Sequence, residues 1–310
     1  MIIEQKQREK ENCNFNWLYF QSARDGFKAI LKTSGLGRKK ILLPGYVGHS
    51  SREGSGVFDP IREIGKDYLF YHMDNRLRID IIDLKKKISK NPGNILLIIN
   101  YFGFIDKNLK ELKNFAIANK MILVEDFAHA FFTFMHSPII DFDYGFFSIH
   151  KLFPEDDGGL VLQRNKLLTS KDKLEFRYDL FRYNFDEIIR RRCNNYDFIN
   201  NKLQDLSKDI DILFPDRGSN IPQTFPILLA NKKIRDDVYF KMNERGYGAV
   251  SLYHTMIAEL DETFVNEHDI SRRILNLPLH QDIESYQLDE MLKILIEIVK
   301  GHKEDQSLSK

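Results

Sequence analysis

The chain has 310 residues, 43% of them hydrophobic, so it can bury a large core and is long enough for more than one domain. Its 46 basic and 45 acidic residues leave a net charge of +1, which gives no long-range field to attract nucleic acid or a membrane surface. The charged N-terminus lacks the apolar segment of a signal peptide, and no apolar run reaches the length of a membrane span, so we expect a cytoplasmic protein.

The first half of the chain alternates strand and helix patterns. Residues 1–14 predict a flexible arm, and apolar residues at mixed three- and four-residue spacing predict a helix over 17–36. A Gly- and Ser-rich loop is expected at 45–60. Short apolar runs predict strands at 41–43, 68–73, 95–99 and 121–124, and helices are expected at 80–90 and 108–119. Runs that are apolar on both faces are typical of parallel strands covered by helices, so we predict an α/β fold with ligands beyond the carboxyl ends of the strands.

The second half has a different texture. After a strand at 159–162, a long polar-faced helical region is expected over 170–206, and prolines and glycines near 215–222 indicate a linker. Shorter elements follow: strands at 225–229, 249–252 and 274–277, and helices at 235–245 and 287–299. We therefore predict a large α/β domain over 1–210, a smaller C-terminal α+β domain over 211–300 and a disordered tail over 301–310.

The candidate site lies in residues 123–162. Asp126 ends one apolar run, Ser148 ends the next, and Lys151 follows three residues later, ahead of a Gly158–Gly159 pair. A lysine in a dry pocket can lose its proton near neutral pH and form a Schiff base with an aldehyde. Pyridoxal phosphate is the commonest cofactor held by such a link, and it also needs a carboxylate near its ring nitrogen, donors for its phosphate and a flat surface against its ring. Each residue alone has an ordinary structural interpretation, so the ordered set carries the hypothesis.

Two segments, VEDFAHAF and SIHKLFPEDDGGLVL, together resemble the signature of the DegT/DnrJ/EryC1/StrS family of sugar aminotransferases, in its short SxxK-type subgroup. The resemblance implies the type I fold of pyridoxal-phosphate-dependent transferases, whose large domain has a mostly parallel seven-stranded-type sheet flanked by helices. By match, Asp126 would contact the pyridine nitrogen and His129 the ring hydroxyl. Ser148 would contact the phosphate, and Lys151 would form the Schiff base.

The same resemblance extends to the flanking segments. Ala23 and Arg24 lie where the family has a helix start that binds phosphate. The family's usual ring-stacking aromatic residue falls on or near Gly48, so the stacking surface must come from elsewhere, and His49 and Tyr46 are the candidates. No metal ligand set is expected, because the two cysteines stand far apart and the histidines show no ligand spacing.

Several functions stay open. The resemblance implies an aminotransferase that moves an amino group from a donor such as glutamate to a keto sugar. In our interpretation the sugar is nucleotide-linked, the pathway is surface-glycan or antibiotic-sugar biosynthesis, and the protein is a homodimer. An alignment shifted by one residue would put His150 at the catalytic position, as in the family's few dehydratases; the spacing of Lys151 from the Gly-Gly pair favours the lysine. The third hypothesis is a non-catalytic family member that binds a nucleotide sugar or a partner protein.

Overall fold

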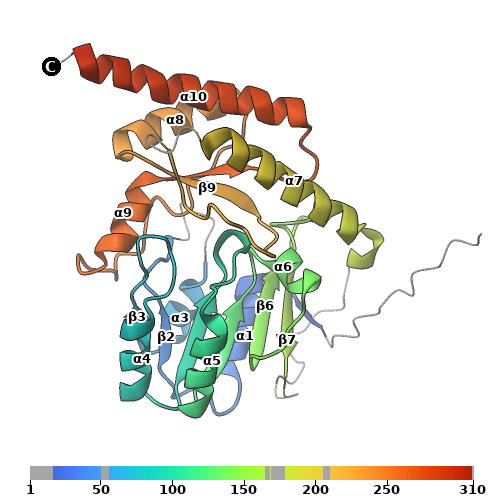
Figure 1. The fold of residues 1–310 in the computed structure, drawn as a ribbon. Coiled ribbons are helices and arrows are strands. Elements are labelled where there is room, and N and C mark those ends of the chain that lie inside the picture. The colour runs from blue at the N-terminus through green and yellow to red at the C-terminus, as the bar shows by residue number, and fades with distance from the viewer. Residues whose placement is uncertain (1–16, 50–55, 165–167, 169–178, 205–209, 309–310) are drawn as a thin grey trace, which may run out of the picture.

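A computed structural model describes residues 17–49, 56–164, 168, 179–204 and 210–308. The flexible arm expected at 1–14 lies outside these residues. Two sheets organise the described chain. The large sheet is built from the first half, and the small sheet lies, with helices of the second half, at one end of the large sheet (Figure 1). Within the described residues, no helix has the length and apolar character needed to cross a membrane.

The large sheet confirms the predicted mostly parallel architecture. Within the described residues it has seven strands in the order β1-β7-β6-β5-β4-β2-β3. From β3 through β2, β4 and β5 to β6 the pairing is parallel, whereas β7 runs antiparallel to both β6 and β1. Their bounds are β1 Leu18–Phe20, β2 Ile41–Pro44, β3 Tyr68–Tyr71, β4 Ile95–Ile99, β5 Ile122–Asp126, β6 Tyr144–Ser148 and β7 Gly159–Gln163.

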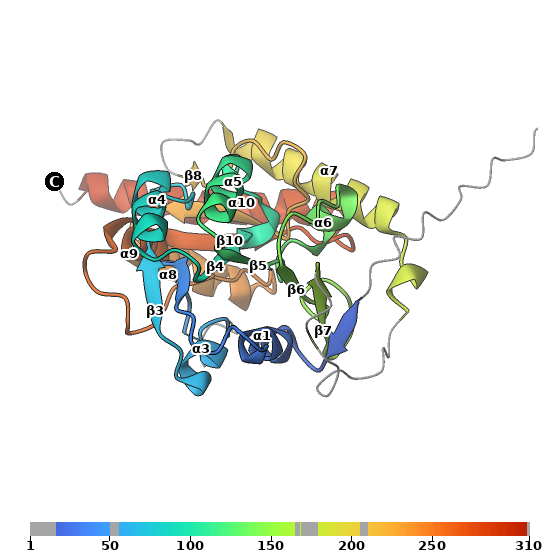
Figure 2. The same cartoon turned by 90° about the horizontal axis from the view of Figure 1, so that it is seen from below.

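Helices cover both faces of this sheet. Figure 2 shows α1 and α3 on one face, with α4 and α5 on the other. Along β4, Ile95 and Leu97 pack into the core on the α1 side, while Leu96 and Ile98 pack into the core on the α5 side. Burial on both faces explains why the strand reads as an unbroken aliphatic run. The helices are α1 Ala23–Lys32, α3 Asp59–Ile64, α4 Ile81–Lys90, α5 Leu109–Ala118 and α6 Phe131–His136, with a 3₁₀ turn at Tyr101–Gly103.

The small sheet is antiparallel, in the order β10-β9-β8, and helices pack against it. Its strands are β8 Ile210–Ile212, β9 Thr224–Leu229 and β10 Ile274–Pro278. The helices of this part are α7 Phe185–Leu203, α8 Lys232–Glu244, α9 Val265–Arg273 and α10 Ser285–Leu308, after a 3₁₀ turn at Leu180–Arg182. The bounds predicted for the two domains stay a prediction.

Three expected elements differ from the structure. The helix predicted over 17–36 is divided into β1 and α1, because Phe20 pairs with Gly159 of β7 and this pairing outweighs the helical spacing. The strand predicted at 249–252 is reduced to one bridge between Val250 and Asn276. Residues 301–308, expected to be disordered, continue α10, because extending an existing helix costs less than starting one.

Candidate functional site

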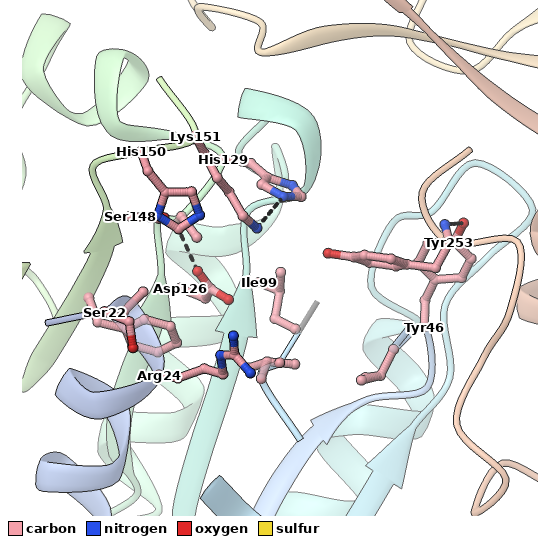
Figure 3. Close-up of a pocket in the computed structure, with 16 residues that line it drawn as sticks. Ser22, Arg24, Tyr46, Ile99, Asp126, His129, Ser148, His150, Lys151 and Tyr253 are labelled. Carbon is pink, nitrogen blue, oxygen red and sulfur yellow. Dashed lines mark hydrogen bonds between the residues drawn. The ribbon is translucent and has the colours of Figure 1, made fainter. Parts of the chain in front are cut away.

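A pocket lies at the carboxyl ends of β4, β5 and β6, closed on its other sides by the start of α1 and by loops. Six of the seven predicted site residues line it: Ala23, Arg24, Asp126, His129, Ser148 and Lys151. Figure 3 labels all of these except Ala23. The parallel register places Asp126 level with Ile99 of β4 and Phe146 of β6, so the ends of these three strands meet at the pocket. Residues that are far apart in sequence thus share one cavity at the edge where ligands of α/β sheets bind.

Asp126 ends β5 with its carboxylate inside the protein. The side chain is buried, and one carboxylate oxygen, Oδ1, accepts a 2.7 Å hydrogen bond from the backbone N–H of Ala128. Burial raises the pKa of Asp126 to about 6, against the opposing effects of the Ala128 N–H and the charge of Lys151. A cationic partner in the pocket would therefore stabilise this carboxylate.

Lys151 reaches into the same pocket and meets His129. Its Nζ lies 3.0 Å from Nε2 of His129, as the dashed line in Figure 3 marks. Burial lowers the pKa of Lys151, Asp126 opposes this shift, and Arg24 adds to it. The pKa of His129 lies well below its ordinary value because the ring is buried and Lys151 is close.

The contacts of His129 assign the tautomer of its ring. The backbone N–H of Phe102 donates to His129 Nδ1 at 3.3 Å, and the Phe102 ring stacks on the imidazole with centroids 5.8 Å apart. A neutral imidazole that accepts at Nδ1 carries its proton on Nε2. That proton then points at Lys151 Nζ, which can accept it only as a neutral amine. The pair therefore fits a lysine that is a nucleophile.

The opposite end of the pocket suits an anion. Ser148 is buried at the end of β6, opposite Gly159 of β7, and the first residues of α1 lie close by. The side chain of Ser22 caps α1 by accepting from the N–H of Asp25 at 3.2 Å. The first N–H groups of a helix have no partner within the helix, and the helix dipole favours negative charge there. Together these groups form a site of the kind that holds a phosphate.

Gly159 makes this end of the pocket possible. A Cβ built on Gly159 would overlap backbone atoms of Ser22 and Ala23, well inside 3.0 Å. Backbone atoms cannot rotate out of the way as a flexible side chain can. The Gly158–Gly159 pair therefore lets the start of α1 lie directly on β7, beside Ser148.

Two further side chains stand near the anion end. The guanidinium of Arg24 donates to Asp59 Oδ2 at 3.2 Å and is largely exposed. His150 is exposed overall, but its Nδ1 faces inward, 3.3 Å from the Ser148 hydroxyl. Partial desolvation of the ring and the charges of Lys151 and Arg24 lower its pKa, against the opposing charge of Asp157. His150 thus sits with Ser148, whereas Lys151 sits with His129.

The stacking candidates have a different outcome. His49 is not among the residues that line the pocket; its backbone N–H donates to the carbonyl of Thr255 at 2.9 Å. His49 as a cofactor contact therefore stays a prediction, without a place in the pocket. Tyr46 does line the pocket, and so does Tyr253, which the sequence analysis missed. The unfilled position at Gly48 was the available signal for it.

A buried charged cluster lies behind the pocket and was also missed. Glu125, next to Asp126 in β5, is fully buried on the other face of the sheet and pairs with Lys113 of α5. Asn100 donates to both Glu125 Oε2, at 3.4 Å, and the backbone carbonyl of Asp126, at 3.3 Å. This cluster fixes the strand that carries the site carboxylate. Among the described side chains, no group of three or more His, Cys, Asp or Glu could hold a metal ion.

The described chain has the fold of solved aminotransferase structures, which confirms the fold predicted from the sequence. A DegT DnrJ EryC1 StrS aminotransferase from Brucella abortus matches 91% of this chain and 85% of its own, with a TM-score of 0.71 and 14% identity. Helicobacter pylori PseC, an aminotransferase involved in the biosynthesis of pseudoaminic acid, matches 92% and 87%, with a TM-score of 0.72 and 16% identity.

The putative sugar aminotransferase Spr1654 from Streptococcus pneumoniae, in its PMP-form, gives a TM-score of 0.73 at 14% identity, with 92% of this chain and 86% of that chain covered. No family model matches the sequence, and no curated protein matches it. At these identities the likeness establishes the fold, and the activity has to be argued from the pocket.

Proposed function

We propose that the pocket holds pyridoxal 5′-phosphate and that the protein is an aminotransferase. The observation that carries the proposal is the pairing of Lys151 with His129 beside the buried Asp126, in the same pocket as Ser148 and the start of α1. The donor set fits this cofactor, because it offers an amine, a carboxylate and an anion site in one cavity. The fold and the resemblance of the two sequence segments point the same way.

Each residue has a distinct task in this proposal. Lys151, as a neutral amine, would form the covalent link to the cofactor aldehyde with loss of water, and its freed amine would afterwards carry the proton to and from the substrate carbon. Asp126, as a carboxylate, would favour a proton on the ring nitrogen, and the Nε2–H of His129 would donate a hydrogen bond to the oxygen of the ring hydroxyl. When bound, pyridoxal phosphate supplies an electron sink for charge that develops at that carbon.

The anion end would hold the phosphate. The N–H groups of Ala23 and Arg24, at the start of α1, and the hydroxyl of Ser148 are donors there. The exposed guanidinium of Arg24 adds positive charge at the same place. Fixing the phosphate holds the reactive end of the cofactor within reach of Lys151.

The position of His150 favours an aminotransferase over a dehydratase that uses this histidine. His150 lies with Ser148, at the anion end, and Lys151 lies with His129. In this proposal the reactive end of the cofactor lies at Lys151, so a group that moves protons at the substrate carbon has to lie there too. The non-catalytic alternative predicts no covalent cofactor link at all.

The substrate and the assembly are proposed by analogy. Two of the structures of the same fold are a putative sugar aminotransferase and an aminotransferase involved in the biosynthesis of pseudoaminic acid. We infer that this chain aminates a keto sugar, nucleotide-linked, with glutamate as the donor, in surface-glycan or antibiotic-sugar biosynthesis. We also infer that it works as a homodimer in the cytoplasm.

The test is covalent labelling. Protein incubated with pyridoxal phosphate should gain a visible absorption band that glutamate bleaches, and borohydride should fix one cofactor on Lys151, located by mass spectrometry. Lys151→Ala should lose both signals, whereas Lys66→Ala, which removes a different buried lysine, should keep them. Labelling at another lysine, or a band retained in Lys151→Ala, would refute the assignment. Protein loaded with pyridoxal phosphate but not treated with borohydride should then aminate nucleotide-linked keto sugars.

A further inference from the structure

Tyr253 lies against Gly48, where a side chain at position 48 would otherwise be. A Cβ built on Gly48 would lie 2.5 Å from Cγ and 2.8 Å from Cβ of Tyr253, closer than real Cβ atoms approach. Gly48 is not among the glycines with positive φ, so its backbone conformation admits other residues. The ring of Tyr253 is thus what requires glycine at position 48.

Backbone hydrogen bonds fix the segment that carries Tyr253 to the loop after β2. Gly48 forms an antiparallel bridge with Met256, and Ile257 N–H donates to Val47 O at 3.1 Å. The hydroxyl of Tyr46 donates to Leu252 O at 3.0 Å and accepts from Tyr253 N–H at 2.7 Å. This hydroxyl therefore holds both the carbonyl and the N–H of the Leu252–Tyr253 peptide in place.

The ring of Tyr253 is directed into the pocket. Figure 3 shows its phenol extending from the right-hand wall toward the space bounded by Ile99, Asp126 and Lys151. Tyr253 is only 6% exposed, and its ring lies 5.7 Å from that of Tyr46. Aromatic neighbours and a fixed backbone leave the ring little freedom to move away. Such a preorganised flat surface binds a planar ring at low entropic cost.

We propose that Tyr253 supplies the aromatic surface against the cofactor ring, in place of a side chain at position 48. The inference rests on the proposed function, because it assigns a ring partner to the cofactor named there. It makes Tyr253 a cofactor-binding residue contributed by the chain after β9, more than 200 residues from Gly48. Ala128 also lines the pocket, and its small side chain leaves room for a flat ring.

The test is the affinity for pyridoxamine 5′-phosphate, measured by isothermal titration calorimetry. This ligand has no aldehyde, so its affinity reports the pocket without the link to Lys151. Tyr253→Ala should weaken binding roughly ten-fold, the size expected for loss of one aromatic stacking partner. Tyr253→Phe should bind like the unmodified protein, and Tyr286→Ala, at an exposed tyrosine, should change nothing.

Two more variants keep the test decisive. If Tyr253→Ala does not fold, as judged by circular dichroism, Tyr253→Leu keeps apolar volume without a flat ring and should bind equally weakly. In the double variant Tyr253→Ala/Gly48→Phe, the new side chain at position 48 replaces the lost ring of Tyr253, and the affinity should be mostly recovered.

The outcomes separate the two proposals. Unmodified affinity in Tyr253→Ala or Tyr253→Leu would overturn the role of the ring, and so would Tyr253→Phe binding as weakly as the alanine variant. Absence of pyridoxamine phosphate and pyridoxal phosphate binding by the unmodified protein would overturn the proposed function and this inference together.

Discussion

Gly159→Ala tests how the anion end of the pocket is built. The added methyl group would overlap the backbone of Ser22 and Ala23, so the start of α1 has to shift away from β7. Overpacking of this kind costs about 1–3 kcal/mol of folding free energy, and a lower entropy of the unfolded chain offsets about 0.4–1 kcal/mol. We expect a net loss of stability, together with weaker binding of pyridoxal phosphate.

The assay is urea unfolding of the cofactor-free protein, followed by titration with pyridoxal phosphate. Gly37→Ala is the matched control, because nothing lies within 4 Å of its added Cβ and Gly37 is not among the glycines with positive φ. It should be neutral or slightly stabilising. If Gly159→Ala unfolds at the same urea concentration as Gly37→Ala and binds the cofactor equally well, the close approach of α1 to β7 is not what shapes the site.

Two other predictions concern buried charge. Because the pKa of Asp126 is raised to about 6 in the folded protein and is near 3.9 when unfolded, the folded state binds more protons between about pH 4 and 6, and stability falls as pH rises through that window. Cofactor-free Asp126→Asn should lack this loss, so at pH 8 its free energy of unfolding in urea should exceed that of the unmodified protein by up to about 3 kcal/mol. The same pH dependence of stability in both proteins would contradict the raised pKa. Lys113→Met should lower the free energy of unfolding by about 3–5 kcal/mol, because it leaves the Glu125 carboxylate buried without its cationic partner. Lys113→Met/Glu125→Leu should recover most of that stability. A single variant as stable as the double variant would count against the pairing.

The parallel core was predictable because local sequence and tertiary environment agree there. The aliphatic run at 95–99 coincides with β4, and Asp80 caps α4 by accepting from the N–H of Asp83 at 3.0 Å. In such segments the local preference and the distant packing partners favour the same structure, so the local pattern is enough to identify it. The ends of strands could therefore be located to within a residue or two, and with them the place of Asp126 and Ser148.

The rest depended on partners that no local pattern reveals. β1 is a strand because Phe20 pairs with Gly159, and the 17–36 pattern contains no trace of that partner. Tyr253 enters the pocket through contacts with Tyr46 and Gly48, and its own neighbours in sequence only suggested a strand. Gly48 indicated that a ring surface was missing, but no local pattern indicated which distant segment would supply it.

The bonding of the loop after β2 to residues 255–257 also bears on the order of folding. The walls of the pocket span residues 22 to 253, so a chain made only up to β7 has the carboxylate, the lysine and the helix start but lacks one side. Contacts between such distant residues form late, after the loop-closure entropy has been overcome. A ligand that touches both Asp126 and Tyr253 can therefore bind tightly only once the last third of the chain has docked. The rate of ligand uptake during refolding would therefore report when the last third of the chain docks.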